Sequence, residues 1–309
     1  MFPILLLALG LDDRPVVGIL TLPSIEGLPT NHTYLPASYV KWMESAGARI
    51  APVRFDAPRD ELRALADSLN GLVFTGGSND IFDPDSGKPT PYFDTALFLY
   101  NIAAAKDPNA LRLWGTCLGF ELIASFASGA TTSDTFLGHF DAENITLPLD
   151  FTAAAARSRL FGGAPSSTMK DLSTLPITMN EHNRGVTPVS VAKNSAIRVL
   201  ATSTDRNGDE FVSALELVDS PVFATQFHPE RPAFEWFTDR AVPHSPAAVG
   251  AMSYLASAFV ASTRARKPKD FASAQAEQDA LIYSWPATDT RAASDYYEQT
   301  YFFPMFPAA

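Results

Sequence analysis

The sequence is poor in cysteine and in basic residues, and both shortages limit what the protein can be. Cys117 is the single cysteine among 309 residues, so an intrachain disulfide and paired-cysteine metal sites are excluded. Lysine and arginine number 23 against 34 aspartates and glutamates, which gives a formal net charge of -11. The acidic balance and the lack of basic stripes argue against a nucleic-acid partner.

The apolar start of the chain is too short to span a bilayer, which takes about 20 apolar residues. Residues 1–11 suit the core of a cleaved signal peptide, and Ala8-Leu9-Gly10 fits a small-x-small cleavage pattern, but no Lys or Arg precedes it. We expect residues 1–13 to be a signal peptide or its remnant, with a first buried strand as the alternative. Glycosylation sequons at Asn31 and Asn144 favour delivery to a vacuole or lysosome, or secretion.

Short apolar runs alternate with helical patterns along the chain, in a composition that is 46% hydrophobic and 18% charged. We expect strands at residues 16–20, 48–53, 72–74, 111–114 and 222–226, and helices at 38–46, 58–69, 92–106 and 247–264. This alternation predicts an α/β fold with a doubly wound, mostly parallel sheet flanked by helices, whose sites lie beyond the carboxyl ends of the strands. We expect residues 14–309 to form a single domain, with the aromatic C-terminal end packed on it.

The stretch 111–129 places Cys117 where an apolar run becomes a helical pattern. Small neighbours, Gly115 and Gly119, suit a strained strand-to-helix elbow that holds its central side chain up. We expect the N-terminus of the following helix to favour the thiolate, the form that attacks carbonyls. The alternative is a small buried hydrophobe.

Three loops at expected strand ends carry the parts that a cysteine nucleophile needs: a base, a group that orients the base, and donors for an oxyanion. His228 is the candidate base for Cys117 and Glu230 its orienting group. The backbone N–H groups of Gly77 and Leu118 are the candidate donors. Each residue alone also fits a structural role, but their order and shared position favour one site.

Metal and cofactor motifs do not appear in the sequence. The loop at residues 83–87 lacks the glycine position and terminal glutamate of a calcium loop, and no HExxH pattern occurs. The Gly-Gly loop at residues 75–78 lacks the lysine of a phosphate-binding loop. We therefore expect neither a metal nor a cofactor.

Together these motifs resemble those of the class I glutamine amidotransferase-like hydrolases, and within them the γ-glutamyl hydrolase family. The matching stretches, from about residue 15 to 267, include Gly115-Thr116-Cys117-Leu118-Gly119-Phe120-Glu121, Gly76-Gly77-Ser78 and His228-Pro229-Glu230. The resemblance implies Cys117 as nucleophile, His228 and Glu230 as the rest of a triad, and Gly77 and Leu118 as oxyanion donors.

The same resemblance implies that Tyr34, Glu121 and His182 contact the substrate. It also implies hydrolysis of γ-glutamyl amide bonds in folyl- and antifolyl-polyglutamates through a thioester acyl-enzyme, with a small-molecule substrate and no membrane partner; a homodimer stays open. Another γ-glutamyl amide hydrolase, a glutaminase and a non-catalytic binding protein are the alternatives.

An acidic substrate would need local cations near Cys117. The candidates are Arg157, Arg159 and Arg184, which cluster in the irregular middle of the chain. Solvated surface charges are the alternative for these arginines.

Overall fold

The computed structural model describes residues 13–131 and 136–307. The expected signal peptide therefore lies, except for Asp13, outside the described residues. Within the described part of the chain, no helix is long and apolar enough to cross a membrane.

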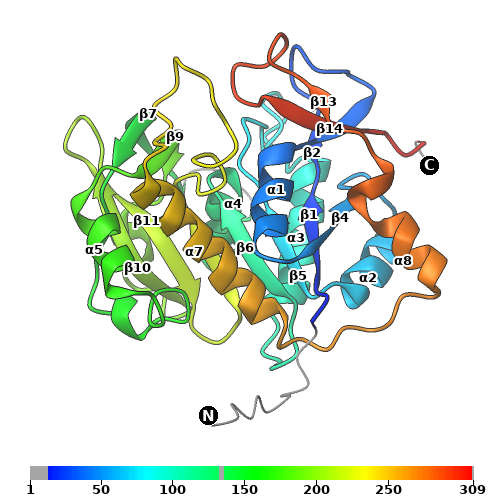
Figure 1. The fold of residues 1–309 in the computed structure, drawn as a ribbon, viewed down its shortest axis with the longest axis horizontal. Helices are drawn as coiled ribbons and strands as arrows, with labels where there is room; N and C mark the ends of the chain where they lie inside the picture. Colours follow the sequence, from blue (N-terminus) through cyan, green and yellow to red (C-terminus); the bar gives the residue numbers. More distant parts are fainter. Residues whose placement is uncertain (1–12, 132–135, 308–309) are drawn as a thin grey trace, which may run out of the picture.

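A central eight-stranded sheet organises the molecule (Figure 1), in the order β4-β1-β5-β6-β12-β11-β10-β8. Its strands are β1 (Val16–Leu20), β4 (Arg49–Val53), β5 (Gly71–Phe74), β6 (Arg112–Thr116), β8 (Asp150–Phe151), β10 (Ile197–Thr204), β11 (Glu210–Leu217) and β12 (Val222–Thr225). The five from β4 to β12 are parallel, and the other three extend the sheet as antiparallel strands. The prediction of a mostly parallel sheet is confirmed.

Helices cover both faces of this sheet and thereby bury its parallel strands on both sides. One apolar cluster contains side chains of α2 (Arg59–Ser68), α3 (Pro91–Ala103) and α4 (Leu118–Ala127). The other contains side chains of α1 (Ala37–Ser45), α5 (Ser166–Thr174) and α7 (Pro246–Thr263). In the second cluster the Trp42 ring meets the ring of Trp114, a residue of β6, edge-on at 5.3 Å. The helices thereby fix the positions of the strand ends.

Local sequence sets where the longer helices begin. Thr90 and Ser245 each cap a helix by accepting a hydrogen bond from the backbone N–H three residues later, and each is followed by proline at the first helical position. Short helices complete the described set: α6 (Pro188–Val191), α8 (Ala274–Ala280), and the 3-10 turns η1 (Ala155–Arg157) and η2 (Ile282–Ser284).

Two smaller sheets lie at the end of the molecule where the loops after β5, β6 and β12 emerge (Figure 1). One is a ribbon of β7 (Gly138–Leu147) and β9 (Thr178–Gly185), in the stretch that appeared irregular from sequence. The other joins β2 (Leu22–Pro23), β3 (His32–Pro36), β13 (Thr288–Asp289) and β14 (Gln299–Pro304). Because β14 pairs with β3 and buries Phe303, the C-terminal segment lies on the body of the protein.

Candidate active site

Cys117 occupies a strained turn between β6 and α4. Its φ of 50° and ψ of -107° fall in a region that L-residues rarely adopt, and its N–H donates to the Thr225 carbonyl at 2.9 Å. A Cβ on Gly119 would lie 2.3 Å from the Phe74 oxygen, and one on Gly115 would lie 2.6 Å from the Gly119 oxygen. Only glycine fits at these two positions, so the elbow expected from the sequence is present.

His228 and Glu230 form a buried hydrogen-bonded pair in the loop after β12. The His228 Nδ1–H donates to Glu230 Oε1 at 2.7 Å, and the two residues are 2% and 0% exposed. The backbone N–H of His228 donates to the Met179 carbonyl of β9 at 2.8 Å, which anchors the loop. The other ring nitrogen, Nε2, is buried and has no hydrogen-bond partner among the described residues. The imidazole is therefore oriented at one nitrogen and available at the other.

Gly76, in the loop after β5, is the point where that loop meets the loops that carry Cys117 and His228. A Cβ there would lie 2.6 Å from His228 Cε1 and 3.2 Å from Cys117 Cβ, so both side chains pack directly against this glycine. Its N–H donates to the Tyr39 hydroxyl oxygen at 2.8 Å, and that oxygen lies 3.5 Å from His228 Nδ1. Burial and the nearby Glu230 raise the pKa of the Tyr39 phenol, which keeps it a neutral hydroxyl beside the pair.

Burial holds Cys117 as a thiol at rest. Desolvation raises the pKa of the Cys117 thiol well above its ordinary value, and the carboxylates of Glu121 and Glu230 raise it further. The Arg231 charge and a hydrogen bond from the Leu118 N–H oppose this rise without reversing it. The helix N-terminus acts in the expected direction through the Leu118 N–H, but burial outweighs it, so the thiol pKa is raised overall. A base must take the thiol proton.

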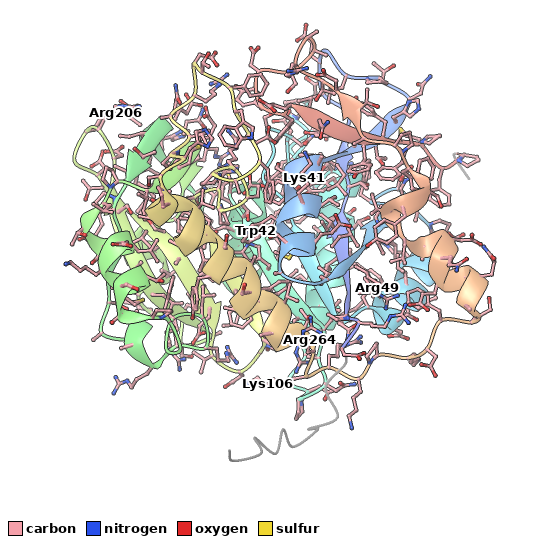
Figure 2. All side chains as sticks on the ribbon, in the orientation of Figure 1. Lys41, Trp42, Arg49, Lys106, Arg206 and Arg264 are labelled. Carbon is pink, nitrogen blue, oxygen red and sulfur yellow. The ribbon has the colours of Figure 1, made fainter. Side chains whose placement is uncertain are left out.

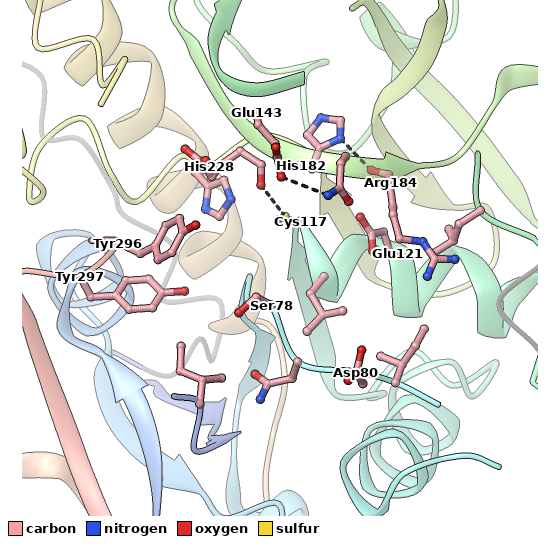
Figure 3. Close-up of a pocket in the computed structure, with 18 of the residues that line it drawn as sticks. Ser78, Asp80, Cys117, Glu121, Glu143, His182, Arg184, His228, Tyr296 and Tyr297 are labelled. Carbon is pink, nitrogen blue, oxygen red and sulfur yellow. Dashed lines mark hydrogen bonds between the residues drawn. The ribbon is translucent and has the colours of Figure 1, made fainter. Parts of the chain in front are cut away.

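A cavity of about 320 Å³ opens beside the sulfur (Figure 3). Its wall includes the following residues singled out from the sequence: Gly77, Cys117, Leu118, Glu121, His182, Arg184 and His228. The structure thus gathers one cavity from residues that lie more than a hundred positions apart in the chain.

Glu121 is a buried carboxyl on the cavity wall. The Gln226 side-chain amide donates to its Oε1 at 3.0 Å, and burial raises the pKa of Glu121 to about 7. That hydrogen bond and the Arg184 charge offset only part of the desolvation. Glu121 is therefore largely neutral in mildly acidic solution and increasingly charged above pH 7.

His182 lines the same cavity, but its ring is held by the protein. Its Nδ1 lies 2.7 Å from the Arg184 carbonyl oxygen, and its Nε2 lies 3.2 Å from Asn180 Oδ1. Burial lowers the pKa of His182 to about 4, so the ring is neutral over the physiological range. These contacts favour a fixed wall over a mobile proton carrier.

Tyr34 does not line the cavity, contrary to expectation. It is fully buried on β3, with its ring 6.2 Å from that of Tyr297. Tyr297 and its neighbour Tyr296 line the cavity in its place. The reason is the C-terminal segment, which lies along β3 and covers Tyr34.

The expected arginine cluster is also corrected, because only Arg184 reaches the cavity. Arg159 donates to the Ser220 carbonyl at 2.8 Å and lies 3.7 Å from Glu216, and Arg157 is exposed on η1. The sequence reasoning missed Arg231, which lines the cavity although it is only 3% exposed. Its position directly after His228-Pro229-Glu230 was the signal that could have found it.

The described residues contain no group of three or more His, Cys, Asp or Glu side chains that could hold a metal ion. The reactive side chains on the cavity wall include the Cys117 thiol, the His228 imidazole and the Glu121 carboxyl. These can perform nucleophilic attack with base assistance.

Comparisons with known proteins show which family the chain belongs to. The Peptidase C26 family matches residues 15–230. Gamma-glutamyl hydrolase B of Dictyostelium discoideum is 34% identical over 301 residues, 95% of this chain and 84% of that protein. Gamma-glutamyl hydrolase of Bos taurus is 36% identical, and the match covers 87% of this chain and 83% of that protein. Gamma-glutamyl hydrolase of Homo sapiens is 34% identical, and the match covers 94% of this chain and 90% of that protein. Matches of this length and identity show that the chain belongs to the Peptidase C26 family of gamma-glutamyl hydrolases.

Proposed function

We propose that this protein is a cysteine hydrolase that cleaves γ-glutamyl amide bonds of folyl- and antifolyl-polyglutamates through a thioester, without a cofactor. The observation that carries the proposal is the meeting of Cys117 and His228 against Gly76, with His228 oriented by Glu230. A buried thiol with a raised pKa needs such a base, and the pair supplies one.

In the first half-reaction, His228 Nε2 accepts the thiol proton while Cys117 Sγ attacks the γ-carbonyl carbon. The oxyanion that forms accepts hydrogen bonds from the backbone N–H groups of Gly77 and Leu118. The Leu118 N–H already points at the sulfur, which supports this assignment. His228 then returns the proton to the departing amine nitrogen as the C–N bond breaks, leaving a thioester on Cys117.

In the second half-reaction, His228 removes a proton from water, whose oxygen attacks the thioester carbonyl. The C–S bond breaks, the sulfur regains the proton and a carboxylic acid leaves. Glu230 stabilises the imidazolium in both halves from its position 2.7 Å away, on the ring nitrogen that does not exchange protons with the substrate.

The cavity offers groups suited to an acidic substrate. Arg184 can pair with a substrate carboxylate. Glu121 and His182, both on the wall, would contact the substrate, and below pH 7 a neutral Glu121 does not repel its carboxylates. This dependence suits an acidic compartment, and we propose delivery to a vacuole or lysosome, or secretion. Imaging of a tagged full-length chain tests the location, and an exclusively cytosolic signal would contradict it.

The decisive assay is incubation with a pteroyl polyglutamate, with products resolved by chromatography. We expect shortened pteroyl products and free glutamate species from the wild type, and none from Cys117→Ala, because no other described group on the wall can form the thioester. Retention of more than a few per cent of the wild-type rate would overturn the assignment. Ammonia release from glutamine without polyglutamate cleavage would indicate a glutaminase, and binding without turnover a binding protein.

A further inference from the structure

The two ends of the cavity differ in chemistry. Figure 3 shows Glu121 and Arg184 on one side of Cys117, and Tyr296 and Tyr297 on the other. All of these residues line the cavity. The end with Glu121 and Arg184 is the charged end. The other, the aromatic end, presents two tyrosine rings beside the buried Arg231 guanidinium, and the nucleophile lies between the two ends.

Tyr296 presents its ring at the aromatic end. The residue is 38% exposed and lines the cavity. The Arg240 guanidinium lies over the ring, 4.6 Å from its centroid, in cation–π geometry. Arg240 is in turn 3.5 Å from Glu181 Oε1, and the backbone oxygen of Glu181 lies 3.8 Å from Cys117 Sγ. The ring is thus tied to the residue that adjoins the sulfur.

The residues that follow Tyr296 also contact the body of the protein. Tyr297 is 4% exposed, and the Arg231 guanidinium lies 5.9 Å from its ring centroid. The Glu298 N–H donates to Glu235 at 2.9 Å, and the Trp236 N–H donates back to Glu298 at 3.0 Å. These contacts hold the segment that carries Tyr296 in place, so the position of its ring is fixed.

We propose that Tyr296 is a specificity residue that packs against the aromatic cap of an aryl-capped γ-glutamyl chain, while the charged end receives the carboxylates. The inference rests on the proposed function and deepens it. A folyl-polyglutamate has an aryl group at one end and γ-linked carboxylates at the other, which matches the two ends of the cavity. With the innermost γ-amide at Cys117, the aryl group lies towards Tyr296 and the departing glutamate towards Arg184.

The test compares two substrates that share one scissile bond: p-aminobenzoyl-Glu-γ-Glu and acetyl-Glu-γ-Glu. In Tyr296→Ala we expect kcat/KM for the aryl substrate to fall about two- to tenfold, the size of one aromatic contact, with the acetyl substrate unchanged. Tyr296→Phe, which keeps the ring, should retain the wild-type ratio. Tyr283→Ala is the matched control, because Tyr283 is an exposed tyrosine, 62% exposed, that does not line the cavity.

An inhibition measurement on the wild type tests the inference even if the Tyr296 variants fail to fold. p-Aminobenzoylglutamate should inhibit cleavage of the acetyl substrate more strongly than acetylglutamate does. Equal inhibition by the two, equal loss on both substrates in Tyr296→Ala, or no loss on the aryl substrate would overturn the inference and leave the proposed function standing. A wild type that cleaves neither substrate would overturn both.

Discussion

Adding one methyl group at Gly76 should disable the site while leaving the fold in place. In Gly76→Ala the new Cβ would lie 2.6 Å from His228 Cε1 and 2.9 Å from the Tyr39 hydroxyl oxygen, closer than Cβ contacts normally come. The imidazole must then move by about 1 Å from its place beside Cys117, and a misplacement of that size can cost about 10²-fold in rate. We therefore expect kcat to fall about 10²-fold, with a loss of stability of about 1–3 kcal/mol from overpacking.

The measurement pairs the rate of γ-glutamyl amide cleavage with a thermal unfolding curve for each variant. Gly250→Ala is the control, because a Cβ there meets nothing within 4 Å and the residue is exposed in α7. It should keep the wild-type rate and be slightly more stable, since alanine is the better helix former. A Gly76→Ala protein that folds and retains a rate within about threefold of the wild type would refute the reasoning, because its His228 would then not need its present position.

Two further predictions concern the buried acids and the base. His228→Asn should lower kcat about 10²- to 10⁴-fold, which is the usual contribution of a general base. Glu230→Gln should lower kcat by a smaller factor, and an equal or larger loss in Glu230→Gln would contradict the roles assigned to the two residues. Burial raises the pKa of Glu121 and of Glu235 from 4.5 to about 7, so the folded protein holds two protons that the unfolded chain releases near pH 4.5. The free energy of unfolding should therefore fall as pH rises from 4.5 to 7, by up to about 3 kcal/mol per carboxyl. Urea titrations at several pH values should show a smaller fall of this free energy in Glu121→Gln than in the wild type.

The geometry of the proposed catalytic centre was predictable from the sequence because its parts lie in local sequence patterns. The glycines around Cys117 predicted the elbow, and the apolar runs predicted the parallel strands that bring it next to His228 and Glu230. The order of those strands in the sheet then explains why loops far apart in the chain meet at Gly76.

The periphery of the site was less predictable, because it depends on pairing between distant segments. Tyr34 was expected at the cavity, but the pairing of β14 with β3 places Tyr297 over it, and nothing in the sequence near Tyr34 reveals that pairing. The raised pKa of the Cys117 thiol was not predictable for a similar reason. The helix N-terminus is a local feature, whereas the burial that outweighs it comes from the whole fold.

In the proposed site, the groups that perform the chemistry and the rings that contact the aryl cap come from different parts of the chain. The Peptidase C26 match ends at residue 230, the position of Glu230, yet Tyr296 and Tyr297 line the cavity from the C-terminal segment that follows it. Two proteins with the same residues up to that point can therefore present different walls to a substrate. An engineer who wished to change the preferred cap of the γ-glutamyl chain would exchange this segment and leave Cys117, His228 and Glu230 untouched.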